Sequence, residues 1–367
     1  MESITALTED FKSYVITAFT LLLLAIFVGY LIYMSRLNQR ECGHMNTLYP
    51  SVNGNLRAIQ EGDEDCQHAL YDYYIKTAYN ACSGGAYKND FVDVCNLKAV
   101  IKQGARCLDF EIYSIDNEPV VSTSSIVDNY HVKETFNAVP FTEVMSIIRN
   151  YAPNSTGTCP NSTDPMIIHL RCKSANAAMY AALAGICKAN TDILLGPEYS
   201  YELEGKNIGV VPLLNLRGKV LLFMDRSNPK FQENEELMEY VNAATNSVFV
   251  REYDFYGVKN NPDMSELVEF NKQGMTIVLP DRGPNPSNPS GIVCRADGCQ
   301  ITAMRYQYVD DNLTEMALFF DRSSYAFALK PEELRYHPVT VDMPTPQNPE
   351  YSYVTRTAES DYYKFQF

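Results

Sequence analysis

Short apolar runs recur along most of this chain, separated by polar stretches that have either helical spacing or no regular spacing. This alternation is typical of a βα array and therefore of an α/β fold. The pattern predicts helices over Phe141–Tyr151 and Ala175–Asn190. The predicted strands are Ile75–Tyr79, Cys107–Tyr113, Pro119–Thr123, Met166–Arg171, Val220–Met224, Val248–Tyr253, Met275–Leu279 and Phe327–Lys330, with Ile301–Tyr306 as a ninth candidate.

One apolar run, residues 14–34, is much longer than a strand and contains no charged residue. About 20 apolar residues are needed to cross a bilayer as a helix, so this segment is long enough to span one. A cleaved signal peptide is the alternative. It would have a shorter apolar core and a small-residue cleavage site, whereas Tyr33-Met-Ser-Arg36 follows here. We therefore expect a short tail over residues 1–13 and a retained transmembrane helix over residues 14–34.

The charges around this segment favour one orientation. Arg36 and Arg40 follow the segment, whereas mainly acidic residues precede it. Positive charge tends to stay on the inner side, which predicts a cytosolic barrel. The sequons at Asn154 and Asn161, together with the cysteines, leave the opposite side open.

The chain has ten cysteines, all after the apolar segment. That number is ordinary for buried thiols in a chain of 367 residues, and disulfides are left open. Without a Cys-x-x-Cys pair, a zinc site is not expected. Cys107, Cys172 and Cys187 lie in apolar runs and are expected to be core thiols.

The net charge of −15 excludes one class of partner. Nucleic-acid phosphates need a basic surface, so no nucleic-acid binding is expected. Strong electrostatic attraction to anionic lipid is disfavoured for the same reason. The expected contact with the bilayer is therefore residues 14–34 themselves.

Several segments carry a recognisable series of motifs. They are 104–113 (GARCLDFEIY), 118–125 (EPVVSTSS), 216–222 (LRGKVLL), 267–280 (LVEFNKQGMTIVLP), 298–307 (GCQITAMRYQ) and 328–335 (ALKPEELR). In this order they resemble the X and Y regions of eukaryotic-type phosphoinositide-specific phospholipases C. The resemblance implies a TIM-type (β/α)8 barrel of the phospholipase C-like phosphodiesterase kind over residues 70–336. Residues 35–69 would then be a linker, and residues 337–367 an extended C-terminal tail.

The resemblance also implies where two catalytic histidines would stand. Those positions hold Tyr79 and Ser125. General acid and base groups each contribute roughly a hundred- to ten-thousand-fold to a rate, and neither replacement has a suitable pKa near neutrality. His169 could be a relocated histidine, because it shares a strand face with Arg171. A packed or hydrogen-bonded histidine of the barrel interior is the alternative for His169.

A calcium site is implied by the same resemblance. Asn80, Asp109 and Glu111 match three of its ligands, with the two acidic residue types exchanged. Arg171 stands in place of the last ligand, a glutamate. We expect Arg171 to pair with the two carboxylates, so the calcium site is predicted lost and no cofactor or metal is expected. Arg282 is a candidate phosphate-binding residue.

These features favour a membrane-anchored phospholipase C-like protein that has lost catalysis and acts as a structural or binding module. The alternative is an active phosphoric diester hydrolase with a rearranged site, acting on phosphatidylinositol or a related glycerophosphodiester. A single barrel behind an N-terminal anchor also resembles proteins of large double-stranded DNA viruses. That resemblance implies a virion internal membrane as the location, and structural proteins as partners.

Overall fold

The computed structural model describes residues 2–127, 130–152, 157–201, 206–338 and 354–367. They belong to two units, residues 1–335 and residues 336–367, and each unit is described by itself.

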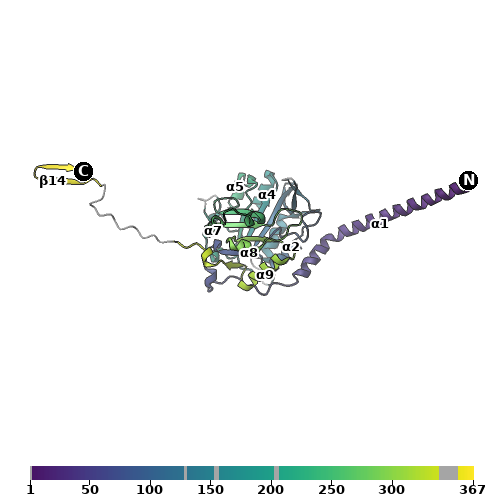
Figure 1. The fold of residues 1–367 in the computed structure, drawn as a ribbon, viewed down its shortest axis with the longest axis horizontal. Coiled ribbons are helices and arrows are strands. Elements are labelled where there is room, and N and C mark those ends of the chain that lie inside the picture. Colours follow the sequence, from purple (N-terminus) through teal and green to yellow (C-terminus); the bar gives the residue numbers. More distant parts are fainter. Residues whose placement is uncertain (1, 128–129, 153–156, 202–205, 339–353) are drawn as a thin grey trace. The chain divides into compact units, whose positions relative to one another are not determined.

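Eight parallel strands form the centre of the first unit, and helices surround them (Figure 1). Neighbouring strands pair in the order β10-β11-β12-β1-β2-β7-β8-β9. No pairing joins β9 to β10 among the described residues, so the barrel is nearly closed. The predicted TIM-type barrel is confirmed. The strands are β1 (Tyr73–Ala78), β2 (Cys107–Ile115), β7 (Met166–Cys172), β8 (Val220–Met224), β9 (Val241–Ala244), β10 (Val250–Asp254), β11 (Met275–Leu279) and β12 (Ile301–Met304).

Three strand predictions need correction. Ile301–Met304 is a barrel strand, whereas β13 (Phe327–Leu329) pairs antiparallel with the start of β1. The run after Pro119 lies in β3 (Glu118–Ser122), which pairs antiparallel with β2 outside the barrel order. β9 was missed because its four residues include only one β-branched side chain and an asparagine. Three further short strands are β4 (Ser124–Val127), β5 (Tyr130–Lys133) and β6 (Val139–Pro140).

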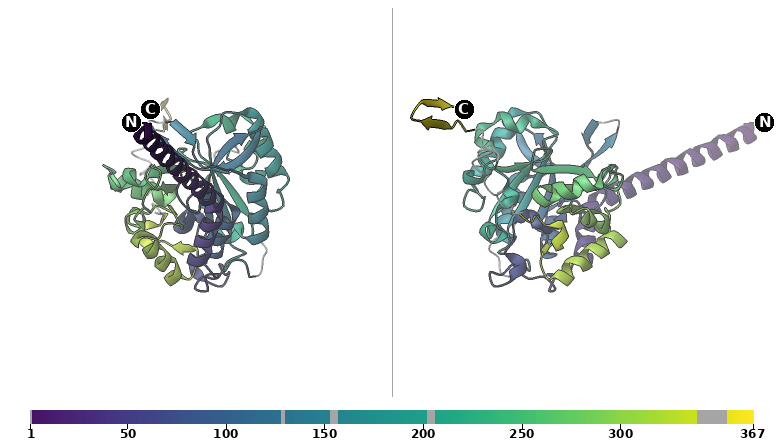
Figure 2. Two further views of the ribbon diagram at one scale, coloured as in Figure 1. Left: turned by 90° about the vertical axis from the view of Figure 1, so that its right-hand side faces the viewer. Right: turned by 60° about the vertical axis from the view of Figure 1, so that its left-hand side comes forward.

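The helices pack around the outside of the barrel (Figure 2). Both predicted helices are present, and the second begins at its Asn176 cap, which accepts the amide of Ala178. The barrel helices are α2 (Val94–Lys102), α3 (Phe141–Tyr151), α4 (Ala177–Lys188), α5 (Glu235–Met238), α6 (Phe255–Lys259), α7 (Met264–Gln273), α8 (Gly291–Ala296) and α9 (Asp311–Ser323). The 3₁₀ helices are Glu64–Cys66, Leu70–Asp72, Pro197–Tyr199, Ile208–Val210, Leu213–Leu216, Pro229–Glu233 and Glu332–Leu334.

The two faces of each barrel strand have different surroundings. On β2, Leu108 and Phe110 point outward into the large core that includes the helices. Cys107 belongs instead to a second core with Ile167 and Phe223. Beyond this apolar interior layer, β2 and β7 carry the inward, charged residues Asp109, Glu111, His169 and Arg171. The barrel therefore has an apolar base and charged residues on one side of its mouth.

The N-terminal helix α1 (Glu2–Leu48) is longer than predicted. Its apolar part is not buried against the rest of the protein, and it is long and apolar enough to cross a membrane. The helix does not end at Met34. The first part of the predicted linker, residues 35–48, is helical, and Leu37 and Met45 in it are buried. These two apolar residues, eight apart on one helix face, explain why the helix continues.

The second unit contains a β-hairpin made of β14 (Thr357–Ser360) and β15 (Tyr363–Gln366). This end of the chain is therefore not a simple extended tail. The signal that was missed is the period-two alternation of Tyr363, Phe365 and Phe367 with polar residues, which is typical of a strand. The prediction for residues 339–353 lies outside the described residues.

The burial of side chains bears on the cysteines and on the two glycosylation sequons. Cys107, Cys172 and Cys187 are buried free thiols, as expected. Asn161 is fully buried, and its amide oxygen accepts a hydrogen bond from Arg106 Nη2 at 2.8 Å. A glycan could not be attached there without unfolding this region. The other sequon, at Asn154, lies outside the described residues.

Candidate functional site

Four charged side chains line the interior near the ends of two adjacent strands. Asp109 and Glu111 lie on β2, and His169 and Arg171 lie opposite them on β7. Residues two apart on a strand share a face, so all four point to the same side of the sheet. All four are buried. Burying such a cluster destabilises the folded protein unless its charges pair and its hydrogen bonds are satisfied.

Arg171 pairs with both carboxylates. Its Nε and Nη2 donate to Asp109 Oδ1 and Oδ2 at 2.8 and 2.7 Å, and Nη1 donates to Glu111 Oε1 at 3.0 Å. Nη2 also donates to Asn80 Oδ1 at 3.1 Å, and the guanidinium lies 4.7 Å from the Tyr79 ring centre. The structure thus brings together the four residues expected from the sequence, Asn80, Asp109, Glu111 and Arg171.

Both carboxylates are also held by other donors. The backbone amide of Asn80 donates to Asp109 Oδ2 at 3.1 Å, and its side-chain amide donates to Glu111 Oε1 at 3.4 Å. Glu111 Oε2 accepts from the Ser124 amide and hydroxyl at 2.9 and 2.7 Å and from the Tyr113 hydroxyl at 3.0 Å. With the contact from His169 to Asp109 Oδ1, every oxygen of the two carboxylates has at least two donors.

The electrostatics follow from this geometry. Burial alone would raise the pKa of the Asp109 carboxyl, but attraction to Arg171 and hydrogen bonds from His169 and Arg171 hold that pKa well below its usual range. Burial would lower the pKa of Arg171, yet the carboxylates raise it well above its ordinary value. Both groups are therefore ionised at neutral pH.

His169 lies behind this cluster. Its Nδ1 is 2.9 Å from Asp109 Oδ1, and its Nε2 is 3.4 Å from Glu252 Oε2 on β10. Burial would lower the pKa of the imidazole, but the hydrogen bond with Asp109 and the attraction to the carboxylates of Asp109 and Glu252 raise it to about 9. The side chain is only 1% exposed, so His169 belongs to the barrel interior.

Tyr79 and Ser125, at the two positions that the resemblance assigns to histidines, have different surroundings. Tyr79 follows the end of β1 and packs edge-on against Tyr87 at 5.5 Å. Burial raises the pKa of its hydroxyl well above the ordinary value. The backbone of Ser125 pairs with Val132 in the β4–β5 hairpin, and its side chain lies outside the described residues.

A cavity of about 370 Å³ opens above the cluster. Arg282 lines it and is exposed, and its role in phosphate binding stays a prediction. The positive charge of Lys173 is partly neutralised before any ligand binds, because its Nζ lies 3.7 Å from Asp225 Oδ2. Burial would raise the pKa of Asp225, but Lys173 and Ser227 lower it. The other lining residues are Tyr79, Glu111, Ser124, Arg171, Ser227, Asn246, Glu252, Tyr253, Asp254, Leu279, Pro280 and Gly283.

Sequence reasoning missed three charged residues that line this cavity. Lys173 lies two residues beyond Arg171, just past the end of β7, so continuing the strand period by one step could have found it. Glu252 and Asp254 both lie at the carboxyl end of β10, which is where barrel sites are built. Four carboxylates and three cations line the cavity, so it has no excess of positive charge for a phosphorylated ligand.

Comparisons with known proteins give a result for the fold alone. The sequence matches no protein-family model, and it matches none of the curated proteins. Among solved structures, it is similar to PLC21 of L. pealei, with 21% identity, a TM-score of 0.57 and coverage of 74% of this chain and 38% of that one. PLC21 of S. officinalis gives 19% identity, a TM-score of 0.57 and the same coverage.

A phosphatidylinositol-specific phospholipase C from Listeria monocytogenes is also similar, with 12% identity, a TM-score of 0.46 and coverage of 74% of this chain and 98% of that one. The chain spans little more than a third of the length of the two PLC21 structures. Together with the strand order, the two PLC21 matches show that this chain has a phospholipase C-like barrel fold.

Proposed function

We propose that this chain is a membrane-anchored phospholipase C-like protein without phosphodiesterase activity, and that it acts as a binding or structural module. The observation that carries the proposal is the two-point ion pair between Arg171 and Asp109, which Glu111 extends. A cation fixed to the chain stands where the resemblance places a calcium ligand.

Calcium does not fit this donor set. A calcium ion takes six to eight oxygen ligands, with charge from carboxylates. Here each oxygen of Asp109 and Glu111 already accepts two or more hydrogen bonds from the protein, and the guanidinium brings its own positive charge. Calcium binding would require breaking the buried ion pair and leaving Arg171 beside a second cation. We therefore propose that the site binds no calcium.

The groups around the cavity also supply little proton-transfer chemistry. Tyr79 keeps its proton at neutral pH, because burial raises its pKa. Neutral imidazole is the form that acts as a base, and His169 is protonated until the pH reaches about 9. His169 does not line the cavity, so a substrate placed there would meet Glu252 and Arg171 first. This placement argues against the alternative of an active hydrolase that uses His169.

The proposed module would present its cavity from a membrane surface. Its mixed lining of carboxylates and partly neutralised cations is better suited to a neutral polar group than to a phosphorylated inositol. Arg282 stays a predicted contact for a single phosphate. A virion membrane as the location, and structural proteins as partners, are predictions of the same proposal.

Calcium titration of the purified full-length chain in detergent tests the proposal. Isothermal calorimetry should show no binding at micromolar calcium. Arg171→Glu is the matched variant, because it places a third carboxylate where the guanidinium stands. The thermal midpoint of this variant should rise with calcium, whereas that of the wild type should not change. Tight, stoichiometric calcium binding by the wild type would contradict the proposal.

A further inference from the structure

The stalk, residues 35–48 at the end of α1, lies against the barrel. Leu37 and Met45 are buried, and Asn38 Nδ2 donates to Asp93 Oδ2 at 3.0 Å. Asn38, Cys42 and Met45 are spaced by four and three residues, so they share one face of the helix. Beyond the helix, the hydroxyl of Tyr49 donates to the carbonyl of Tyr306 at 2.7 Å. The stalk therefore has a defined docking face on the barrel.

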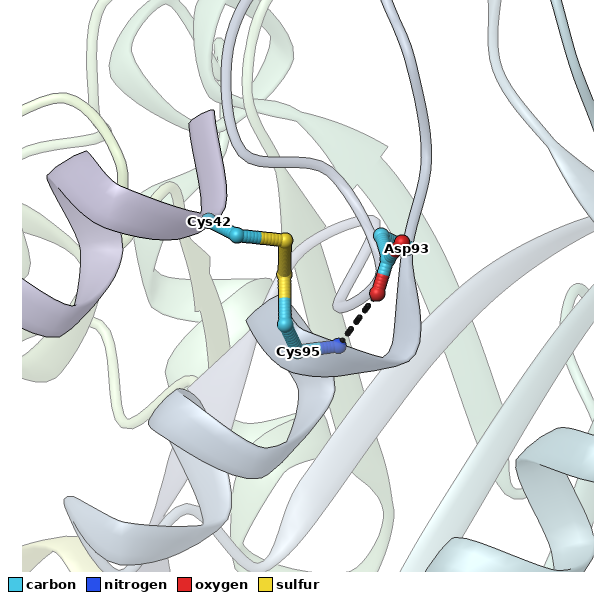
Figure 3. A group of neighbouring side chains, drawn as sticks. All are labelled: Cys42, Asp93 and Cys95. Carbon is cyan, nitrogen blue, oxygen red and sulfur yellow. Dashed lines mark hydrogen bonds between the residues drawn. A yellow bond between two sulfur atoms is a disulfide. The ribbon is translucent and has the colours of Figure 1, made fainter. Parts of the chain in front are cut away.

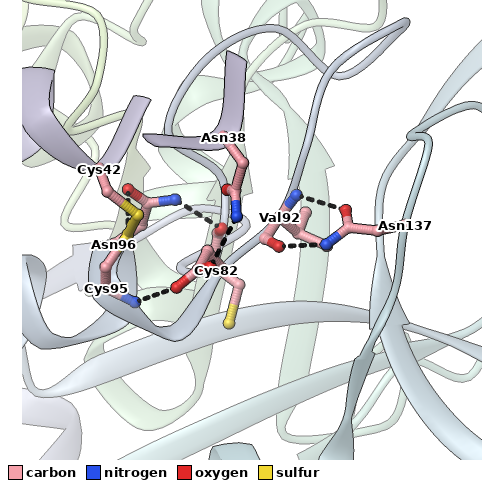
Figure 4. The surroundings of a disulfide bond; sticks show 8 residues. Asn38, Cys42, Cys82, Val92, Cys95, Asn96 and Asn137 are labelled. Carbon is pink, nitrogen blue, oxygen red and sulfur yellow. Dashed lines mark hydrogen bonds between the residues drawn. A yellow bond between two sulfur atoms is a disulfide. The ribbon is translucent and has the colours of Figure 1, made fainter. Parts of the chain in front are cut away.

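A disulfide bond between Cys42 and Cys95 crosses this contact (Figure 3). Their Cα atoms are 5.8 Å apart, within the usual range for a disulfide. Cys95 is in the first turn of α2, where its amide donates to Asp93 Oδ1 at 2.8 Å. Asn38 donates to the other oxygen of Asp93. The Asn38 side chain lies near the disulfide between Cys42 and Cys95 (Figure 4).

These two cysteines differ from the other eight. Cys42 and Cys95 are half-buried, whereas the others are buried free thiols within the part of the chain that the structure describes. A reductant or an exchange partner in solution can therefore reach this bond before it reaches any core thiol. The closed loop holds the stalk, the segment that follows it and β1 in one covalent ring.

We propose that the Cys42–Cys95 disulfide is a redox-sensitive staple that fixes the barrel to the membrane-proximal end of α1. This proposal rests on the proposed function in one respect, because it requires that α1 is anchored in a bilayer. Cys42 lies eight residues beyond Met34, which is about 12 Å along a helix. The staple thus holds the barrel close to the membrane in one orientation, and its reduction frees the barrel to turn on the stalk.

The redox chemistry of the disulfide also indicates on which side of the membrane the barrel lies. On bond formation, each thiol gives up one proton and one electron. A protein or glutathione disulfide of the compartment accepts both electrons and both protons and becomes two thiols. Such disulfides persist in oxidising compartments and are rare in the cytosol. The staple therefore places the barrel on the non-cytosolic side, opposite to the side that the flanking arginines favour.

Thiol mapping of the full-length chain tests the bond itself. Membranes are treated with an alkylating agent before lysis, and the chain is digested without reductant. The peptides containing Cys42 and Cys95 should be recovered joined, and treatment with dithiothreitol should release them. Recovery of both cysteines as alkylated thiols would overturn the proposal. So would one equivalent of zinc in the purified protein, because Cys42, Cys95 and Asp93 offer three ligand atoms within 4.8 Å of one another.

Hydrogen exchange tests what the bond does. Amides of residues 42–48 should exchange at least tenfold faster after dithiothreitol, because only noncovalent contacts, among them those of Leu37, Asn38 and Met45, then hold the stalk. The double variant Cys42→Ser/Cys95→Ser is the control and should exchange at the faster rate with or without reductant. Unchanged exchange on reduction would overturn the staple. Failure of membrane anchoring would be seen separately, as loss of the chain from the membrane pellet.

Discussion

The guanidinium of Arg171 and the carboxylate of Asp109 face each other in a two-point ion pair, with Nε–Oδ1 and Nη2–Oδ2 distances of 2.8 and 2.7 Å. Both side chains are at least nine-tenths buried. Removing one partner of a buried pair leaves an uncompensated charge, which costs about 3–5 kcal/mol. The ion pair at the mouth of the barrel should therefore stabilise the folded protein.

Arg171→Met should lower the free energy of unfolding by about 3–5 kcal/mol, because Asp109 and Glu111 would then be buried without a cation. Urea unfolding followed by circular dichroism measures this. Lys188→Met is the control, since Lys188 pairs with Glu236 at the surface and its substitution should cost less than about 1 kcal/mol. Equal effects of the two substitutions would show that the buried pair contributes no more than an exposed one.

The charged His169 predicts a pH dependence of stability. Its folded pKa of about 9 lies above the ordinary value of 6.5, so its stabilising contribution is fully present below about pH 6.5 and is lost as the pH rises through 9. Lys76 and Lys330, whose pKa values burial lowers to about 8 and about 7, change stability in the opposite sense over this range.

The measurement is therefore a difference between wild type and His169→Gln. The wild type should be more stable than the variant at pH 6.5, by up to about 3 kcal/mol, and the difference should shrink by pH 10. A difference that stays constant between these two pH values would show that the imidazole is neutral in the folded protein.

The apolar part of α1 should be retained as a membrane anchor. After sodium carbonate extraction of membranes, the full-length chain is expected in the pellet with its original N-terminus. A chain that begins at residue 36 is the control and should appear in the supernatant. Recovery of the full-length chain as a soluble protein, or a new N-terminus near residue 36, would contradict the anchor.

The central part of the fold could be predicted because its signals are local. Strands β2 and β7 are runs of apolar residues, and their period of two places Asp109 with Glu111 and His169 with Arg171. The contact between Arg171 and the two carboxylates then follows from the pairing of adjacent parallel strands.

Other features depend on contacts between residues far apart in the chain. Glu252 reaches His169 from β10, which is not a neighbour of β7 in the barrel, and no local pattern encodes that approach. The pairing of Cys42 with Cys95 likewise depends on how α1 docks. β9 escaped prediction because Asn242 interrupts its apolar run, and its side chain instead accepts the amide of Leu222 at 2.8 Å.

Hydrolysis of phosphatidylinositol tests the central claim most directly. Two lost proton-transfer groups would cost about four to eight orders of magnitude in rate if their roles were independent. The purified full-length chain, assayed on phosphatidylinositol vesicles with calcium and with a chelator, should release inositol phosphates no faster than vesicles without protein. Turnover above that background that disappears in His169→Ala would contradict the account and assign catalysis to a relocated histidine.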